Sequence, residues 1–186
     1  METPTKQIIH NFWTLNQPTK GSPALFEKNV FVILDGARNK KIYSRLKQLS
    51  REVYTCLYEG RLPEVLRYAA PYLVELGKDN FTEWLLKESW GDSWGIYLIS
   101  SSSIRDVRRH LRRFLMVEGP NKKQMYFRYY DPRVFRTYLP TCNPDELATI
   151  FGPIDSFISE DEDPKKMIHY THKDFELESK FIELKK

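Results

Sequence analysis

Apolar runs and helically spaced apolar positions, separated by glycine, proline and polar residues, divide the chain into short strands and helices. The unbroken apolar run at residues 30–34 is typical of a strand that is covered on both faces. Apolar residues that recur three or four positions apart predict amphipathic helices. The predicted strands span residues 30–34, 53–58, 72–76 and 95–100, and the predicted helices span about residues 40–51, a short stretch before Pro71, about residues 80–90 and about residues 104–114.

The second half of the chain contains turn and cap signals that place further elements. A Gly-Pro-Asn turn at residues 119–121 predicts a hairpin of two strands that ends near residue 130. Asp-Pro at residues 131–132 and Asn-Pro at residues 143–144 each put an N-cap residue before a proline that suits the first helical position. Two more short helices are therefore predicted after the hairpin.

The alternation of strands with helices predicts an α/β (α+β) fold, in which a mixed β-sheet carries flanking helices. The hairpin requires at least one antiparallel pair. At 186 residues the chain has the length of a single compact domain. Within it we expect an N-terminal arm at residues 1–29, a folded domain at residues 30–160, and an acidic linker with a polar C-terminal segment at residues 161–186.

The composition is that of a globular protein. Hydrophobic residues make up 41% of the chain and charged residues 29%, which excludes intrinsic disorder and collagen-like repeats. Cys56 and Cys142 are too few for a disulfide framework, so a reducing compartment is expected. The amino terminus lacks a secretory signal pattern, and no apolar run approaches the roughly 20 residues of a membrane helix. We therefore expect a cytoplasmic protein with no membrane partner.

Positive charge is concentrated in one predicted helix. Residues 104–115 contain five arginines and one aspartate, a local excess that equals the net charge of +4 for the whole chain. At 100 degrees per residue the arginines share one side of the helix and the apolar residues another. A cationic face of this kind meets phosphates, an acidic partner protein or carboxylates of the same chain, such as those at residues 160–163. No base-reading motif accompanies the arginines, so protein contact or internal pairing is favoured and nucleic acid is not expected. The arginines are Arg105, Arg108, Arg109, Arg112 and Arg113, and the candidate partner contacts among them are Arg105, Arg109 and Arg112.

A second dense stretch alternates charged and aromatic residues. Arg128, Tyr130, Asp131 and Arg133 are its candidate partner-binding residues, because arginine and tyrosine are enriched among the anchors of protein interfaces. An ion-paired structural corner, in which Asp131 caps a helix and pairs with an arginine, explains the same residues equally well.

Two motifs suggest an enzyme as an alternative. Residues 91–95 match the G-x-S-x-G pattern of a hydrolase nucleophile, with Ser93 at its centre, but that motif needs a strand before the serine and a helix after it, and here the order is reversed. Asp35 follows a buried strand, where phosphate-handling enzymes place a carboxylate, although Asp-Gly is also a strong turn signal. A hydrolase using Ser93 or a phosphate-handling enzyme using Asp35 is the alternative function.

Other chemistry is not supported. His169 and His172 have a spacing that suits metal ligands, but their polar surroundings offer no fixed further ligand, so no metal site is expected. No P-loop and no G-x-G-x-x-G motif exists, so no nucleotide site and no cofactor are expected.

Taken together, the motifs resemble the effector-chaperone family of bacterial type VI secretion, the Tap or Tec adaptor chaperones first catalogued as a domain of unknown function. The matching segments occur in the family's order and cover about residues 30–160, and FRYYDPRV is the most specific of them. They are VFVILDGAR, CLYEG, APYLVEL, WGDSWG, RRHLRRFLMV, FRYYDPRVFRTYLPTC and FGPI.

The resemblance implies a dedicated cytoplasmic chaperone that holds a toxic effector and helps to load it onto the valine-glycine repeat (VgrG) spike protein. It implies no catalytic residues, no enzymatic activity and no cofactor. Residues 30–160 would then form the effector-chaperone domain, and the expected partners are a type VI effector and the VgrG spike. The resemblance assigns no individual role to any residue.

Overall fold

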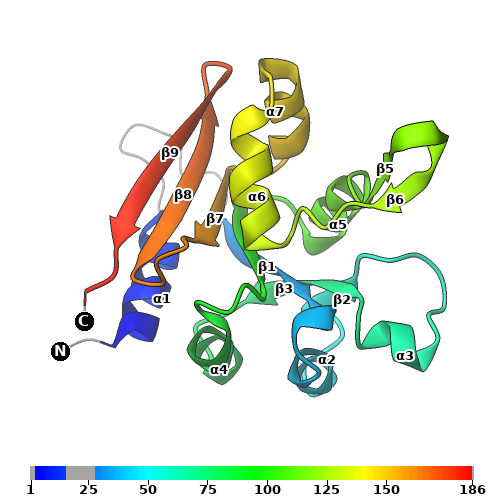
Figure 1. Ribbon diagram of the computed structural model, residues 1–186. Coiled ribbons are helices and arrows are strands. Elements are labelled where there is room, and N and C mark those ends of the chain that lie inside the picture. Colours follow the sequence, from blue (N-terminus) through cyan, green and yellow to red (C-terminus); the bar gives the residue numbers. More distant parts are fainter. Residues whose placement is uncertain (1–2, 16–27, 186) are drawn as a thin grey trace.

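The computed structural model describes residues 3–15 and 28–185, and in this part of the chain a seven-stranded antiparallel sheet forms the centre (Figure 1). Its strand order is β2-β3-β1-β4-β7-β8-β9, and β5 and β6 pair separately as a two-stranded hairpin. The strands are β1 (Asn29–Asp35), β2 (Tyr54–Cys56), β3 (Pro71–Leu76), β4 (Gly95–Ser100), β5 (Met116–Glu118), β6 (Gln124–Tyr126), β7 (Ser156–Glu160), β8 (Lys166–Lys173) and β9 (Glu176–Glu183).

Helices cover both faces of the sheet, as the apolar run of the first strand predicts. Alternate residues of β1 enter two different cores: Phe31 and Ile33 face α5, α6 and α7, whereas Val32 and Leu34 face α1, α2 and α4. Each face therefore buries its own apolar layer. The helices are α1 (Pro4–Leu15), α2 (Lys41–Leu46), α3 (Glu64–Arg67), α4 (Asn80–Ser89), α5 (Ile104–Arg112), α6 (Pro132–Tyr138) and α7 (Pro144–Phe151).

The α+β class and the single compact domain are confirmed, but the expected mixed sheet is wrong. Every strand pair in the described residues is antiparallel. The strands β3 and β4 do run in the same direction and are joined through α4, which is the connection that suggested parallel pairing. However, β1 lies between them and pairs antiparallel with both. The chain thus contains a strand–helix–strand crossover from β3 to β4, but the two parallel strands are not adjacent in the sheet.

Both ends of the chain differ from the prediction. Instead of an arm, α1 buries Ile8 and Phe12 against the sheet, and residues 16–27 of the expected arm lie outside the described residues. Instead of a linker and a polar segment, residues 166–183 form β8 and β9. Charged residues on the exposed side of these strands conceal the alternating pattern. The expectation that residues 30–160 form an independent functional domain stays a prediction.

Helix caps agree with the sequence signals, with one shift. Asp131 and Asn143 cap α6 and α7 as predicted, and Asn143 forms a capping box with Glu146. For α4 the pattern of Asn80 followed by a glutamate predicts a cap at Asn80, but Asp79 caps the helix and accepts a 2.9 Å hydrogen bond from the amide of Thr82. Two adjacent cap-forming residues make the sequence signal ambiguous by one position.

Candidate functional site

The arginine-rich helix α5 is amphipathic, as predicted. Ser103 caps it, and Val107, His110 and Leu111 are buried against the sheet. The His110 ring lies 2.8 Å from the carbonyl oxygen of Ile150, and its burial lowers the pKa of the imidazole below its ordinary value although this hydrogen bond acts in the opposite direction. The apolar side fixes the helix to the core and leaves the arginines along its other side.

The arginines of α5 make different contacts. Arg112 forms an ion pair with Glu59, and Arg108 donates a 2.9 Å hydrogen bond to the carbonyl of Cys56. Arg109 pairs with Asp106 at 2.5 Å, one turn earlier in the helix. None of these contacts involves the acidic residues 160–163. Within the described residues, Glu162 of that run forms an ion pair with Arg136 of α6 instead, at 4.0 Å.

A groove of about 980 Å³ lies between α5, the loop after β2 and the β5–β6 hairpin. The four arginines of α5 and its C-cap Arg113 line it, and Glu59 is the single acidic residue among the lining residues that the structure describes. Leu57, Leu62 and Leu115 supply apolar surface between the charges. The groove thus combines cationic and apolar walls. We call this surface the α5 groove.

The β5–β6 hairpin extends the apolar part of the α5 groove. The cross-strand pair Met116 and Tyr126 is exposed and lines the groove, and the Tyr126 ring lies 5.0 Å from that of Tyr58. The next pair, Val117 and Met125, is exposed on the other face of the hairpin. Several large apolar side chains exposed together, rather than singly, are typical of a contact surface. The sequence predicted this hairpin but gave no indication that its side chains face solvent.

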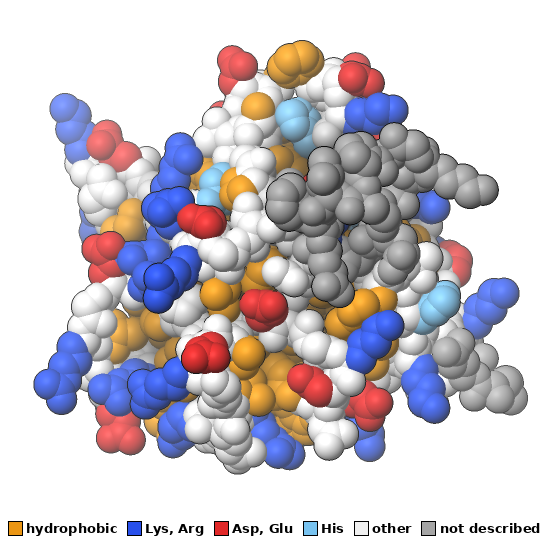
Figure 2. Space-filling model, turned by 180° about the vertical axis from the view of Figure 1, so that it is seen from behind, with side chains coloured by type: hydrophobic (Ala, Val, Ile, Leu, Met, Phe, Trp, Pro, Cys, Tyr) orange, Lys and Arg blue, Asp and Glu red, His pale blue; other side chains and the backbone are white. Residues whose placement is uncertain are grey.

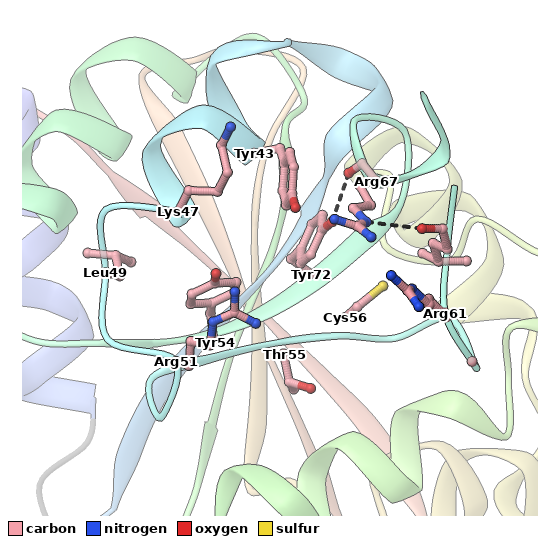
Figure 3. Close-up of a pocket in the computed structure, with 12 residues that line it drawn as sticks. Tyr43, Lys47, Leu49, Arg51, Tyr54, Thr55, Cys56, Arg61, Arg67 and Tyr72 are labelled. Carbon is pink, nitrogen blue, oxygen red and sulfur yellow. Dashed lines mark hydrogen bonds between the residues drawn. The ribbon is translucent and has the colours of Figure 1, made fainter. Parts of the chain in front are cut away.

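A second cationic pocket lies on the other side of β2 and was missed by the sequence analysis. It has a volume of about 630 Å³ and contains Lys47, Arg51, Arg61 and Arg67 (Figure 3). The rings of Tyr43 and Tyr72, 5.5 Å apart, stack in its wall. Leu62 lines both this pocket and the α5 groove, so the two are adjacent. The four cations are separated by four to ten positions in the sequence, so they form no continuous charge run that would have indicated the pocket.

Seen from behind, the molecule has many Lys and Arg side chains crowded on its left side with apolar side chains between them (Figure 2). This is the side that carries β2, α3, α5 and the β5–β6 hairpin at the right of Figure 1. The surface around the edge strand β2 is therefore predominantly basic.

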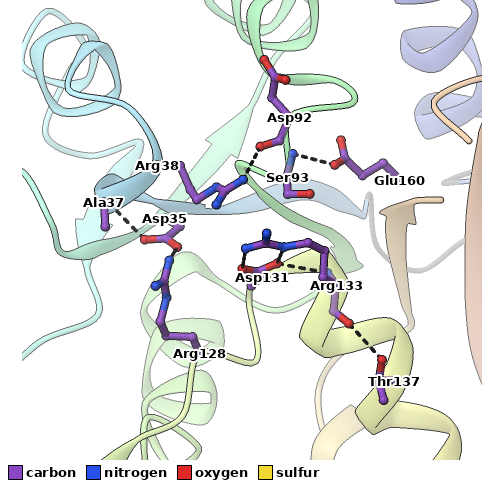
Figure 4. A network of polar contacts seen from close by, with 10 residues as sticks. All are labelled: Asp35, Ala37, Arg38, Asp92, Ser93, Arg128, Asp131, Arg133, Thr137 and Glu160. Atoms are coloured by element: carbon purple, nitrogen blue, oxygen red, sulfur yellow. Dashed lines mark hydrogen bonds and ion pairs between the residues drawn. The ribbon is translucent and has the colours of Figure 1, made fainter. Parts of the chain in front are cut away.

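The second predicted stretch, around Asp131, forms a network of ion pairs inside the fold (Figure 4). Arg128 pairs with the buried Asp35, which also accepts a hydrogen bond from the amide of Ala37 at 3.1 Å. Asp131 caps α6 and binds the Arg133 guanidinium at 2.6 and 3.0 Å. Burial alone would raise the pKa of Asp131, but the bonds from Arg133 hold that pKa below its ordinary value.

The candidate partner residues of this stretch are not equally accessible. Tyr130 and Asp131 are 2% and 4% exposed. The side chains of Arg128 and Arg133 are about half exposed, at 45% and 55%. A partner protein can reach these two arginines, whereas Tyr130 and Asp131 hold the corner together. Partner binding by any of the four stays a prediction.

The geometry around Ser93 differs from that of a nucleophile elbow. Ser93 lies between α4 and β4, so a helix precedes it and a strand follows. The amides of Gly91 and Ser93 donate hydrogen bonds of 2.7 and 2.6 Å to the Glu160 carboxylate. In a nucleophile elbow the oxyanion is bound by the amide of the residue after the serine, whereas the amides bound here are those of Gly91 and of Ser93 itself. Here a carboxylate of the chain itself occupies them, and burial raises the pKa of Glu160 while these bonds oppose the rise.

The glycines of the same motif have structural roles. Gly91 has a φ of +92°, which other residues rarely adopt. A Cβ atom on Gly95 would lie 2.0 Å from the Ile33 carbonyl oxygen, so glycine there permits the pairing of β4 with β1. The pattern G-x-S-x-G is thus explained by chain geometry.

The two histidines of the C-terminal segment lie on β8. His169 is opposite Lys180 in the sheet, and the His172 ring lies 5.4 Å from that of Phe151. Within residues 3–15 and 28–185, no group of three or more His, Cys, Asp or Glu side chains is arranged to hold a metal ion. No helix in these ranges is long and apolar enough to cross a membrane.

Comparison with known proteins places the chain in a family. The model of the family described as "Domain of unknown function (DUF4123)" matches residues 30–149, which include all of β1 but its first residue, the edge strand β2, α5 and the ion-paired corner. The chain belongs to this family. The resemblance found in the sequence, to type VI secretion effector chaperones first catalogued as a domain of unknown function, is thereby confirmed for the family.

A curated relative supports the same assignment. Over 146 residues the chain is 27% identical to "Accessory protein VasW" of Vibrio cholerae, an alignment that covers 77% of this chain. The chain spans about half, 48%, of that relative's length. No solved structure matches the chain.

Proposed function

We propose that this protein is a non-catalytic cytoplasmic chaperone, an adaptor that binds a type VI secretion effector and helps to load it onto the VgrG spike protein. The observation that carries the proposal is the family match over residues 30–149, together with a relative that is named an accessory protein. An accessory or adaptor role requires a surface that binds another protein.

The basic surface around β2 supports this role. The α5 groove offers cationic side chains for acidic groups of a partner and apolar side chains for its hydrophobic groups. Protein interfaces combine an apolar centre with a polar rim in the same way. Arg105, Arg109 and Arg112 are the predicted contacts that line the groove, and the half-exposed Arg128 and Arg133 are further candidates.

The proposal is tested by co-expression of the protein with the effector encoded beside it. We expect a complex of fixed stoichiometry on size-exclusion chromatography with light scattering, and loss of effector secretion in a strain that lacks this protein. If the effector is stable and secreted without it, and no complex forms, the proposed function is wrong.

A non-catalytic role has its own test. Ser93→Ala is expected to leave effector binding and secretion unchanged, because the main-chain amide of residue 93 donates the hydrogen bond to Glu160 and the substitution keeps it. Asp35→Asn is likewise expected to retain binding wherever the variant is folded. An esterase or phosphatase activity of the purified protein that either substitution abolishes would favour the alternative, an enzyme.

A further inference from the structure

We propose that the α5 groove binds an acidic amphipathic helix of the effector, and that Glu59 occupies the place of one of that helix's carboxylates until the effector displaces it. The inference rests on the proposed function and specifies which surface binds the effector and with what chemistry.

The charge of the groove indicates an acidic occupant. Five arginines line it against one glutamate, and arginine binds carboxylates through parallel hydrogen bonds. Arg105 makes no ion pair with any residue in the described ranges, so at least one guanidinium is left for an external anion. An acidic group entering the groove therefore meets fixed positive charge.

The apolar side of the groove favours a protein over a nucleic acid. Met116 and Tyr126, a cross-strand pair of the hairpin, line it and are exposed. Aliphatic and thioether side chains gain little from a phosphate backbone but pack well against apolar side chains. An occupant with acidic residues facing α5 and apolar residues facing the hairpin satisfies both walls.

Glu59 indicates where one partner carboxylate would bind. Its side chain is 82% exposed, whereas that of its partner Arg112 is 20% exposed. The cation is thus held in place by the fold and the anion is not. An ion pair with an exposed partner contributes little to stability, so a competing carboxylate can replace Glu59. The Nε of Arg112 is buried and has no hydrogen-bond partner among the described residues, so the ion pair with Glu59 is made by the terminal nitrogen of the guanidinium.

The dimensions suit a short helix. α5 spans nine residues, which corresponds to about 13 Å at 1.5 Å per residue. A helix of two to three turns laid along it would place residues three and four positions apart on one face. Recognition of this kind depends on a few acidic and apolar anchors of the partner.

The experiment measures the affinity of the purified effector by titration calorimetry for matched variants. Glu59→Gln removes the competing carboxylate, and we expect affinity to rise about threefold or more. Arg105→Glu/Arg109→Glu reverses two exposed charges of the groove, and we expect affinity to fall by about tenfold or more. Tyr126→Ala removes the apolar wall without changing charge and is expected to weaken binding as well.

Controls separate the groove from net charge. Lys40→Glu/Lys180→Glu makes the same charge change on exposed residues of α2's N-cap and of β9, and Glu176→Gln matches the glutamate substitution. These variants are expected to bind like the wild type. Each variant is compared only if its melting temperature is close to that of the wild type. The expected gain in affinity for Glu59→Gln cannot result from unfolding, because unfolding lowers affinity.

The outcomes distinguish this inference from the proposed function. If the wild type binds the effector and neither Glu59→Gln nor the arginine reversal changes affinity, the groove is not the docking site, while the chaperone role stands. If the wild type binds no effector, the proposed function itself fails. Submicromolar binding of an oligonucleotide at physiological salt that the arginine reversal abolishes would also overturn the inference, because the occupant would then be a nucleic acid.

Discussion

Asp35 and Arg128 form an ion pair although 93 residues separate them in the sequence. Asp35 ends the central strand β1 and is 1% exposed, whereas Arg128 lies before α6 and is about half exposed. The pair joins the sheet to the helical layer that carries the ion-paired corner. Because Asp35 is buried and Arg128 is half exposed, removing the arginine and removing the carboxylate are expected to change the stability by different amounts.

We expect Arg128→Met to destabilise the protein more than Asp35→Asn. The first substitution leaves a buried carboxylate without its cation, which we expect to cost about 3 kcal/mol. The second leaves an arginine that can turn toward water and an amide oxygen that can still accept from Ala37, so about 1 kcal/mol is expected. Urea denaturation of both single variants and of the double variant measures the difference. Equal losses would contradict the asymmetry.

Glu160→Ala is expected to destabilise the turn before β4. It leaves the amides of the exposed Gly91 and the buried Ser93 without their acceptor, and we expect a cost of about 1–3 kcal/mol, mainly from the Ser93 amide, which is shielded from water. Ser93→Ala keeps both amide bonds and is expected to cost less. Thermal denaturation compares the two; a larger loss for Ser93→Ala would assign the serine hydroxyl a role beyond this turn.

Asp131→Ala is expected to cost about 1–2 kcal/mol through loss of the α6 cap. Asp131→Asn keeps the cap acceptor but loses the charge that pairs with Arg133, so its smaller effect isolates the ion pair. The pKa of Asp131 is lower in the folded protein than its ordinary value. Its contribution is therefore complete at neutral pH and is lost as the pH falls below about 4. Chemical denaturation at pH 7 and pH 3 checks both statements.

His110 gives the stability a dependence on mildly acidic pH. Burial lowers the pKa of its imidazole in the folded protein, so between about pH 6.5 and that lower value the unfolded chain binds a proton that the folded chain does not. Stability is then complete above about pH 6.5 and decreases as the pH falls. The pKa of the partly buried His169 is lowered by desolvation in the same direction. We expect His110→Gln to reduce the difference in melting temperature between pH 7.5 and pH 5.5, and an unchanged difference would assign it to other groups.

Local signals predicted much of this fold. The apolar run of β1, the Pro-preceding caps of α6 and α7, and the amphipathic α5 all rest on neighbouring residues, and the structure contains each of them. Strand direction could not be predicted in this way, because whether β1 inserts between β3 and β4 depends on tertiary packing.

The candidate site was only partly accessible from sequence for the same reason. The α5 arginines are adjacent in the chain and were identified, but the Glu59 partner and the exposed Tyr126 come from other elements. The exposed fraction of Tyr130 and Asp131 also depends on the surrounding fold, so an interface and a buried corner have the same sequence pattern. β8 and β9 were missed because charged and polar residues outnumber the apolar ones in both sequences and hide the alternation that is typical of a strand.

The two hydrogen bonds between Gln7 and Lys185, of 2.6 and 2.7 Å, hold α1 beside the end of β9. In Figure 1 the first and last described segments meet at the lower left, whereas α5 and the hairpin lie at the right. A short peptide that joins these two segments would therefore create a circular permutant without crossing the basic surface. New ends opened in a loop away from α5 and the β5–β6 hairpin would leave the α5 groove intact. Fluorescent reporters fused at either end of this sequence would likewise lie away from the α5 groove.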